Sequence, residues 1–241
     1  MIYPKAPIVE AIFDVQVELD GTVNLNVFSE IQEKIKNEYP QMTTSFLFSS
    51  QIKINPEKSN IETDNNSIEK GKCFHSEDKR RVIQMREDGF TFNMQAPYTN
   101  WEDFYKTSSF YFKLYIEKFK IKNIKRVALR YINQFMVTDP IDGLSSVINC
   151  IPTIPKGLPS AFSNYYSQIQ IPFVDENIFI NITQSTLEKK ENLLPLLLDI
   201  DVYKFDNISL ENIDKIFCRL REIKNLAFEN SLTQITKDSF K

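Results

Sequence analysis

Apolar and polar side chains alternate at the two-residue period in several segments of this chain, and this alternation constrains the fold more than any other feature. The clearest case is the pair of segments "RRVIQMR" and "FTFNMQA", which flank the turn-forming sequence Asp88-Gly89. A strand pair with one apolar and one polar side is typical of an antiparallel sheet that has one face in the core. The apolar side carries Ile83, Met85, Phe90, Phe92 and Met94, and the polar side carries Gln84, Arg86, Thr91, Asn93 and Gln95.

The predicted elements repeat in a similar order along the chain. The first series runs from a strand at 8–19 through a helix that Pro40 ends and four strands to a long helix at 99–119. The polar stretch at 55–71, "NPEKSNIETDNNSIEKG", is predicted to be a long mobile loop between strands. The second series comprises a strand at 126–135, a short helix at 144–148, strands at 161–171, 177–184 and 196–205, and an amphipathic helix at 209–228.

This order predicts an α+β fold, in which antiparallel sheets carry long helices packed on one face. The repetition suggests two similar halves, residues 1–122 and 123–241, within a single globular unit that spans residues 1–241. The element order resembles the helix-grip and TATA-binding-protein-like arrangements, in which a curved sheet grips a long helix and leaves its other side free.

Composition excludes several classes of protein. The 241 residues are 42% hydrophobic, which is enough for a full core, and their formal net charge is only −3. We expect a cytoplasmic protein, because the sequence shows neither a membrane-spanning segment nor a signal peptide, and its three cysteines form no CxxC pair. Five scattered glycines make no phosphate-binding loop, and one histidine makes no histidine-rich metal site, so we expect no cofactor and no metal.

Five short motifs resemble a known family when they are taken together. They are "PIVEAIF" at 7–13, "YTNWEDF" at 98–104, "RVALRYIN" at 126–133, "LDID" at 198–201 and "FENSLT" at 228–233. In this order they resemble a sporadically distributed family of uncharacterised prokaryotic proteins of about this length. The resemblance implies one cytosolic globular unit and supplies no catalytic residues.

An arginine in the middle of a predicted strand, Arg130, needs a partner. Asp199 and Asp201 lie two residues apart in another predicted strand, so their carboxylates share one face. The favoured interpretation is a structural ion pair, in which one of these aspartates binds Arg130 across neighbouring strands. The alternative is a metal-dependent phosphoryl-transfer enzyme, in which Asp199 and Asp201 hold Mg²⁺ with Glu10 and Asp14 as remote further ligands.

The segment 113–130 is strongly basic, with seven Lys or Arg and one acid, Glu117, which gives a local charge of +6. Such a cluster can bind nucleic acid by neutralising phosphates. The lysines are spread round the predicted end of a helix, however, where cations also complement the helix dipole. A solvated helix end is therefore the favoured interpretation, and nucleic acid is a partner that the sequence allows without favouring it.

The polar side of the predicted sheet is the strongest functional lead. Its side chains are mostly uncharged hydrogen-bonding groups, which is the composition of a surface that contacts another molecule. We expect a non-enzymatic binding or interaction protein, such as an accessory or regulatory subunit, with a protein partner or self-association and no membrane. The candidate binding face comprises Gln84, Arg86, Thr91, Asn93, Gln95, Asn164, Tyr166 and Gln168, and no catalytic residue is assigned.

Overall fold

The computed structural model describes residues 3–21, 23–24, 26–55, 60–137, 143–158, 164–188 and 193–240. Within these ranges the chain forms nine strands, five α-helices and one short 3-10 helix. The strands are β1 (Ile8–Leu19), β2 (Gln41–Asn55), β3 (Asn60–His75), β4 (Arg81–Arg86), β5 (Gly89–Gln95), β6 (Ile121–Val137), β7 (Tyr166–Phe173), β8 (Ile178–Thr186) and β9 (Leu194–Phe205). The helices are α1 (Asn26–Ile35), α2 (Trp101–Lys118), α3 (Gly143–Val147), η1 (Val174–Glu176), α4 (Ile213–Ser231) and α5 (Gln234–Asp238).

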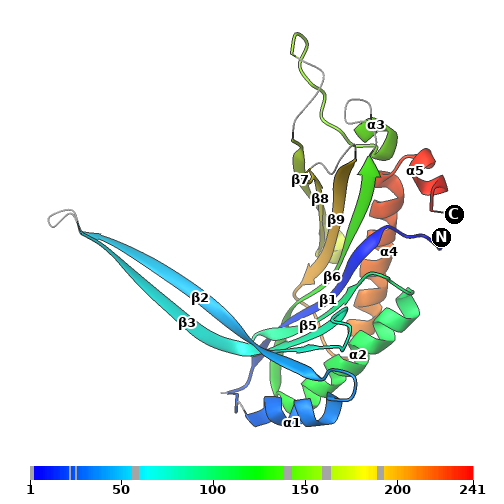
Figure 1. The fold of residues 1–241 in the computed structure, drawn as a ribbon. Helices are drawn as coiled ribbons and strands as arrows, with labels where there is room; N and C mark the ends of the chain where they lie inside the picture. The colour runs from blue at the N-terminus through cyan, green and yellow to red at the C-terminus, as the bar shows by residue number, and fades with distance from the viewer. Residues whose placement is uncertain are drawn as a thin grey trace.

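All nine strands belong to one antiparallel sheet, in the order β2-β3-β4-β5-β1-β6-β9-β8-β7 (Figure 1). The predicted fold class, α+β with antiparallel sheets and long helices packed on one face, is therefore wrong. The physical reason is the central strand β1, which pairs with β5 on one side and with β6 on the other, and so joins strands that the element order alone would place in separate sheets. More of the chain lies in strands than in helices, and the predicted boundary after residue 122 falls inside β6.

The predicted hairpin around Asp88-Gly89 is present as β4 and β5, which pair from Arg81↔Met94 to Arg86↔Gly89. Its apolar side lies in the core, where Ile83, Met85, Phe90 and Phe92 have no exposed surface and Met94 has almost none. Alternation therefore identified both the strands and the face that they bury.

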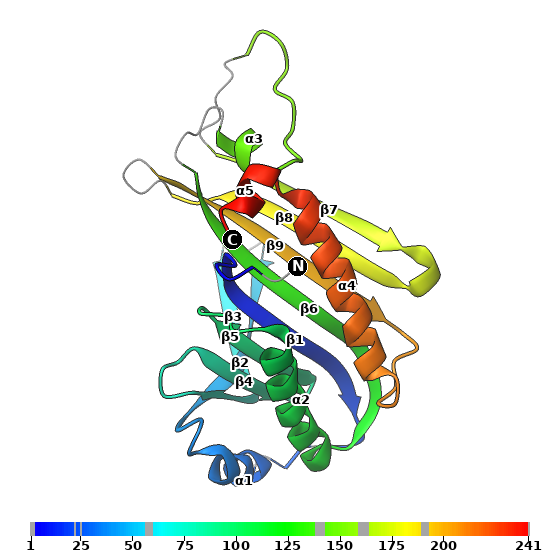
Figure 2. The ribbon, with the colours of Figure 1, turned by 90° about the vertical axis from the view of Figure 1, so that its right-hand side faces the viewer.

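One aromatic side chain, Phe13 of β1, shows how the long helices contact the sheet. Its ring stacks on that of Phe217 in α4, with centroids 4.1 Å apart, and lies 6.0 Å from the ring of Phe112 in α2. Burial of a side chain of this size contributes roughly 1.5–3 kcal/mol. Both helices thus lie over one face of the central strands and cover only part of it (Figure 2), which leaves the opposite face of β1 free of these helices.

Residues 60–71 of the predicted loop at 55–71 form a strand and not a loop, because β3 begins at Asn60. This strand pairs with β2 from Asn55↔Asn60 to Gln41↔His75, and the two form a long ribbon that projects from the rest of the sheet (Figure 1). Residues 56–59 lie outside the described ranges. Low hydrophobicity argues against burial, but a two-stranded ribbon satisfies its backbone groups through the partner strand and needs no buried side.

Thr99 stands three residues before Glu102, a spacing that is typical of a capping box, but the long helix α2 begins one residue later than this spacing would place it. The cap is Asn100, whose Oδ1 accepts a hydrogen bond from the backbone N–H of Asp103 at 2.7 Å. The hydroxyl of Thr99 donates to the Asp103 carboxylate at 2.9 Å. The cap thus joins residues three positions apart, as a capping box does, but the two residues are Asn100 and Asp103 and not Thr99 and Glu102.

Candidate functional site

The polar side chains share one face of the sheet because the strands pair in a fixed register. Residues opposite each other in an antiparallel pair point to the same face. A single row of opposed residues crosses six strands, from β5 through β1, β6, β9 and β8 to β7; its members are Asn93, Ile12, Arg130, Asp201, Asn181 and Gln170. We call the side of the sheet that carries this row the polar face. It lies opposite the side on which Phe13 contacts α2 and α4.

Seven of the eight predicted binding residues lie on this polar face, by the same register. Gln84 and Arg86 come from β4; Thr91, Asn93 and Gln95 come from β5; Tyr166 and Gln168 come from β7. The eighth, Asn164, precedes β7. Its Oδ1 accepts hydrogen bonds from the backbone N–H of Tyr165 and the hydroxyl of Thr186, so it ties the start of β7 to the end of β8.

The centre of the polar face is a network of ion pairs. Asp14 accepts hydrogen bonds from Arg126 at 3.0 Å and from the hydroxyl of Thr91 at 2.7 Å, and it lies 3.6 Å from Arg86. The other end of the Arg126 guanidinium donates to Asp201 at 3.0 Å. These four charged side chains are between 16 and 20% exposed, so the network is shielded from water and joins β4, β1, β6 and β9.

Arg130 binds Asp199 on the neighbouring strand β9 through two hydrogen bonds, of 2.9 Å from Nε and 2.5 Å from Nη2. This bidentate pair raises the pKa of the guanidinium, mainly through the hydrogen bonds to Asp199. Asp201 takes a different arginine, Arg126. The sequence therefore located the acidic partners of Arg130 on the correct strand but missed Arg126, because nothing local shows which strand lies beside β6.

The geometry of Asp199 and Asp201 bears on the metal-site alternative. Their carboxylates do share a face, and both are already bound by arginines of β6. Burial raises the pKa of Asp201, against the opposing effect of Arg126 and Arg130. Within the described part of the chain, no group of three or more His, Cys, Asp or Glu side chains could hold a metal ion. A cation at this place would have to displace a guanidinium from each aspartate.

The β4–β5 end and the β7 end of the polar face differ in how their polar side chains are hydrogen-bonded. On the β4 and β5 side, Arg86 donates to Gln84, Gln84 donates to Asn93, and Asn93 donates to Glu10, at 2.9–3.3 Å. On the β7 side, Tyr166 is 65% exposed, and within the described ranges its hydroxyl donates to Gln168 alone, which is also exposed. The strand β7 is one edge of the sheet and contains no charged residue in its sequence "YSQIQIPF".

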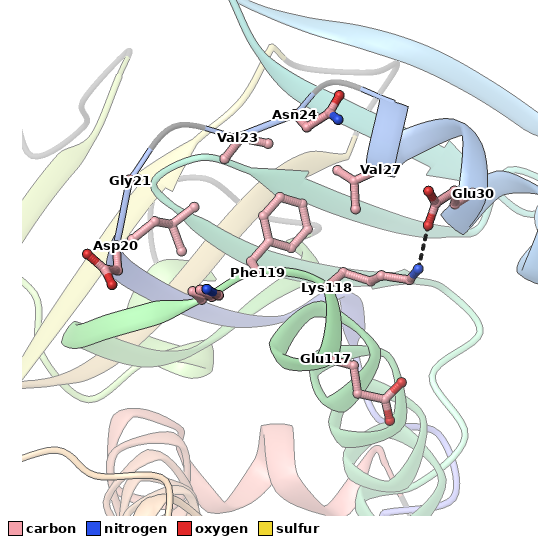
Figure 3. Close-up of a pocket in the computed structure, with 11 residues that line it drawn as sticks. Asp20, Gly21, Val23, Asn24, Val27, Glu30, Glu117, Lys118 and Phe119 are labelled. Carbon is pink, nitrogen blue, oxygen red and sulfur yellow. Dashed lines mark hydrogen bonds and ion pairs between the residues drawn. The ribbon is translucent and has the colours of Figure 1, made fainter.

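The basic segment 113–130 does not form a free positive surface. Lys118 donates to Glu30 at 2.6 Å, Lys122 donates to Glu18 at 2.6 Å, and Lys125 lies 3.5 Å from the same Glu18. The Lys118–Glu30 pair lies beside a hollow of about 480 Å³ where the end of α2 faces the turn after β1 (Figure 3). Together with Arg126 and Arg130, five of the seven basic side chains thus have acidic partners. These partners come from distant segments, which a local count of charge cannot show.

A second cavity, of about 470 Å³, was not predicted. It lies between the N-terminal segment, the loop before α2, strand β6 and helix α4, and we call it the α4 cavity. Four of the five motifs contribute to its walls, with Ile8 from the first, Tyr98 and Trp101 from the second, Tyr131 and Asn133 from the third, and Phe228 and Glu229 from the fifth. Sequence reasoning missed this cavity because its residues come from four separate segments of the chain, from Tyr3 near one end to Glu229 near the other.

A lysine and an asparagine give the α4 cavity its chemistry. Burial lowers the pKa of the Lys224 ammonium to about 7, and the nearby charge of Arg221 acts in the same direction. The Lys224 Nζ lies 4.1 Å from the centroid of the Tyr131 ring, a cation–π contact. The Oδ1 atom of buried Asn133 accepts no hydrogen bond from the part of the chain that the structure describes, while its amide nitrogen donates to the backbone oxygen of Leu198 at 3.1 Å.

Comparison with known proteins assigns no family to this chain: no protein-family model and no curated protein sequence matches it. Within the described residues, none of the helices has both the length and the apolar character needed to cross a membrane. The family resemblance of the five motifs stays a prediction.

Proposed function

We propose that this protein is a non-enzymatic binding protein that docks a partner protein on the β7 side of its polar face. The observation that carries the proposal is the difference between the two sides of this face. The centre and the β5 side use their polar groups on one another, and Gln170 of β7 likewise donates to Asn181 and Tyr203, whereas Tyr166 and Gln168 of β7 are exposed to solvent. Exposed tyrosine and amide side chains are the groups that protein interfaces use for packing and hydrogen bonding.

The charge on the polar face favours a protein over a nucleic acid as the partner. Its central network sets four carboxylates (Glu10, Asp14, Asp199, Asp201) beside three guanidinium groups (Arg86, Arg126, Arg130). A phosphate backbone is bound by an excess of positive charge, which this network does not offer. An accessory or regulatory subunit would use such a face to hold a second protein.

The free edge of β7 adds a second mode of contact. An edge strand offers unpaired backbone N–H and C=O groups, and charged residues on such strands usually prevent unwanted pairing. Since β7 has no charged residue, a strand of the partner can pair with it while the partner's side chains contact Tyr166 and Gln168.

The test is to place a photo-crosslinking residue at Gln168 and, as a matched control, at exposed Lys215 on α4. We expect one protein to be crosslinked in cells from position 168 and not from position 215. After purification, this partner protein should bind the unmodified chain. Its affinity for the Tyr166→Ala variant should be about 30-fold or more lower. The proposal is wrong if position 168 captures only a second copy of this chain, or if the affinity is unchanged by Tyr166→Ala.

A further inference from the structure

The α4 cavity has the size and lining of a small-molecule site. Its volume of about 470 Å³ falls within the range of roughly 300–1,000 Å³ that is usual for such sites, which are mostly apolar with a few placed polar groups. Three aromatic side chains, Tyr98, Trp101 and Tyr131, form part of its walls. The hydroxyls of Tyr98 and Tyr131 lie 2.9 Å apart and hydrogen-bond to each other, so this part of the wall is fixed.

Two basic side chains, Arg221 and Lys224, and two acidic ones, Glu102 and Glu229, line the cavity. Arg221 stacks over the Trp101 ring at 4.9 Å and lies 3.7 Å from Glu102. Glu229 accepts a hydrogen bond from the Tyr3 hydroxyl at 2.9 Å. Among the described side chains, no carboxylate lies within ion-pair distance of the Lys224 amine, although Glu229 acts on it through space.

An unpaired acceptor completes the set of polar groups. Asn133 is only 1% exposed, and among the described residues its Oδ1 atom has no hydrogen-bond donor. A buried acceptor without a donor destabilises the folded state, so such atoms in proteins call for an explanation. A ligand that brings its own donor into the cavity would satisfy this atom.

We propose that the α4 cavity binds a small aromatic carboxylate that also carries a hydrogen-bond donor. The ring lies among the side chains of Tyr98, Trp101 and Tyr131. The carboxylate accepts hydrogen bonds from the Lys224 amine, and the donor of the ligand reaches Oδ1 of Asn133. This site lies across the sheet from the polar face and does not depend on the proposed function.

The ligand chemistry predicts a change in protonation. Before binding, the Lys224 amine is largely neutral at about pH 8, because burial lowers its pKa to about 7. A carboxylate beside it favours the ammonium form, so binding takes up a proton. The other charged groups at the cavity are Arg221, Glu102 and Glu229. Burial raises the pKa of the cavity's tyrosines, to about 12 for Tyr3 and Tyr98, and so keeps these hydroxyls neutral at that pH.

The test is isothermal titration calorimetry at about pH 8 with three probes, in two buffers of different ionisation enthalpy. The probes are 4-hydroxybenzoate, benzoate, which lacks the donor, and 4-hydroxybenzamide, which lacks the charge. We expect 4-hydroxybenzoate to bind at least about tenfold more tightly than either of the others. Its binding should take up close to one proton per chain.

Two variants decide the role of the lysine. Lys224→Met should weaken 4-hydroxybenzoate binding about tenfold or more and abolish the proton uptake, while Lys215→Met, an exposed lysine of the same helix, should change neither. Circular dichroism shows whether both variants keep the fold. The proposal is overturned if none of the probes binds at millimolar concentration, if 4-hydroxybenzamide binds as tightly as 4-hydroxybenzoate, or if folded Lys224→Met still takes up a proton.

Discussion

Replacing Lys224 with methionine removes an amine from a partly buried position and keeps a side chain of similar length and apolar character. The pKa of this amine is about 7 in the folded protein and 10.5 in its ordinary state. Each unit of difference corresponds to about 1.4 kcal/mol, so the lysine lowers the stability of the folded protein by up to about 5 kcal/mol. Since water reaches part of the side chain, we expect the cost to be smaller, so that Lys224→Met raises the free energy of unfolding by about 2–3 kcal/mol where the full cost applies.

The sign of the effect follows from where the proton is bound. Below pH 7 the amine is charged in both states, and the full cost of burying the ammonium is present. Between the two pKa values the unfolded chain binds the proton and the folded protein does not, so the contribution of Lys224 to stability rises with pH. Above the ordinary value of 10.5 the amine is neutral in both states and the cost vanishes.

Urea unfolding of both proteins at about pH 6, 8 and 10 measures this difference. Lys224→Met should be the more stable protein at the lowest pH, and its advantage should shrink steadily towards the highest. Ionisation of tyrosines at high pH affects both proteins alike and cancels in the comparison. Lys215→Met, on the exposed side of the same helix, should show no such trend. A difference that stays constant with pH, or one that favours the wild type at low pH, would refute the reasoning.

Three further substitutions test the sheet. Arg126→Met should destabilise the protein by about 3–5 kcal/mol in urea unfolding, because it leaves the shielded carboxylates of Asp14 and Asp201 without their shared partner; a loss below about 1 kcal/mol would contradict this. Arg130→Met should cost only about 1 kcal/mol by the same measurement, since its side chain is 45% exposed and water screens the pair; a loss as large as that of Arg126→Met would be inconsistent with this difference in exposure. Gly71→Ala should lower the melting temperature by many degrees, because a Cβ there would collide with the backbone oxygen of Met85 on the neighbouring strand. An unchanged melting temperature would contradict this and show that β3 and β4 can separate freely at that point.

The local periodicity of the sequence identified most strands and their buried sides. Ile83, Met85, Phe90 and Phe92 are buried as the alternation predicts, because burial of one face of a strand is a local property of its side chains. Periodicity could not identify β3, since a ribbon that needs no buried side leaves no apolar pattern in its sequence. The arrangement of strands is a long-range property, and for that reason the joining of all nine in one sheet was not predicted.

The candidate sites divide in the same way. The pairing of Arg130 with an aspartate of β9 was accessible from sequence, because both lie in strands with a clear alternation and their charges are opposite. The bridge that Arg126 makes between Asp14 and Asp201 depends on the register of three strands. The α4 cavity depends on four segments meeting, and only the tertiary fold brings Lys224 beside Tyr131 and Asn133.

The ribbon of β2 and β3 has a consequence for how this protein could change. The third strand, β4, pairs with β3 only from Gly71 to His75, so beyond that point the described ribbon has two strands and no further pairing partner in the sheet. Residues added or removed in opposed pairs would keep the register of the remaining ribbon and leave the aromatic core untouched. The reach of this arm can therefore vary between related chains while the body of the molecule keeps its stability.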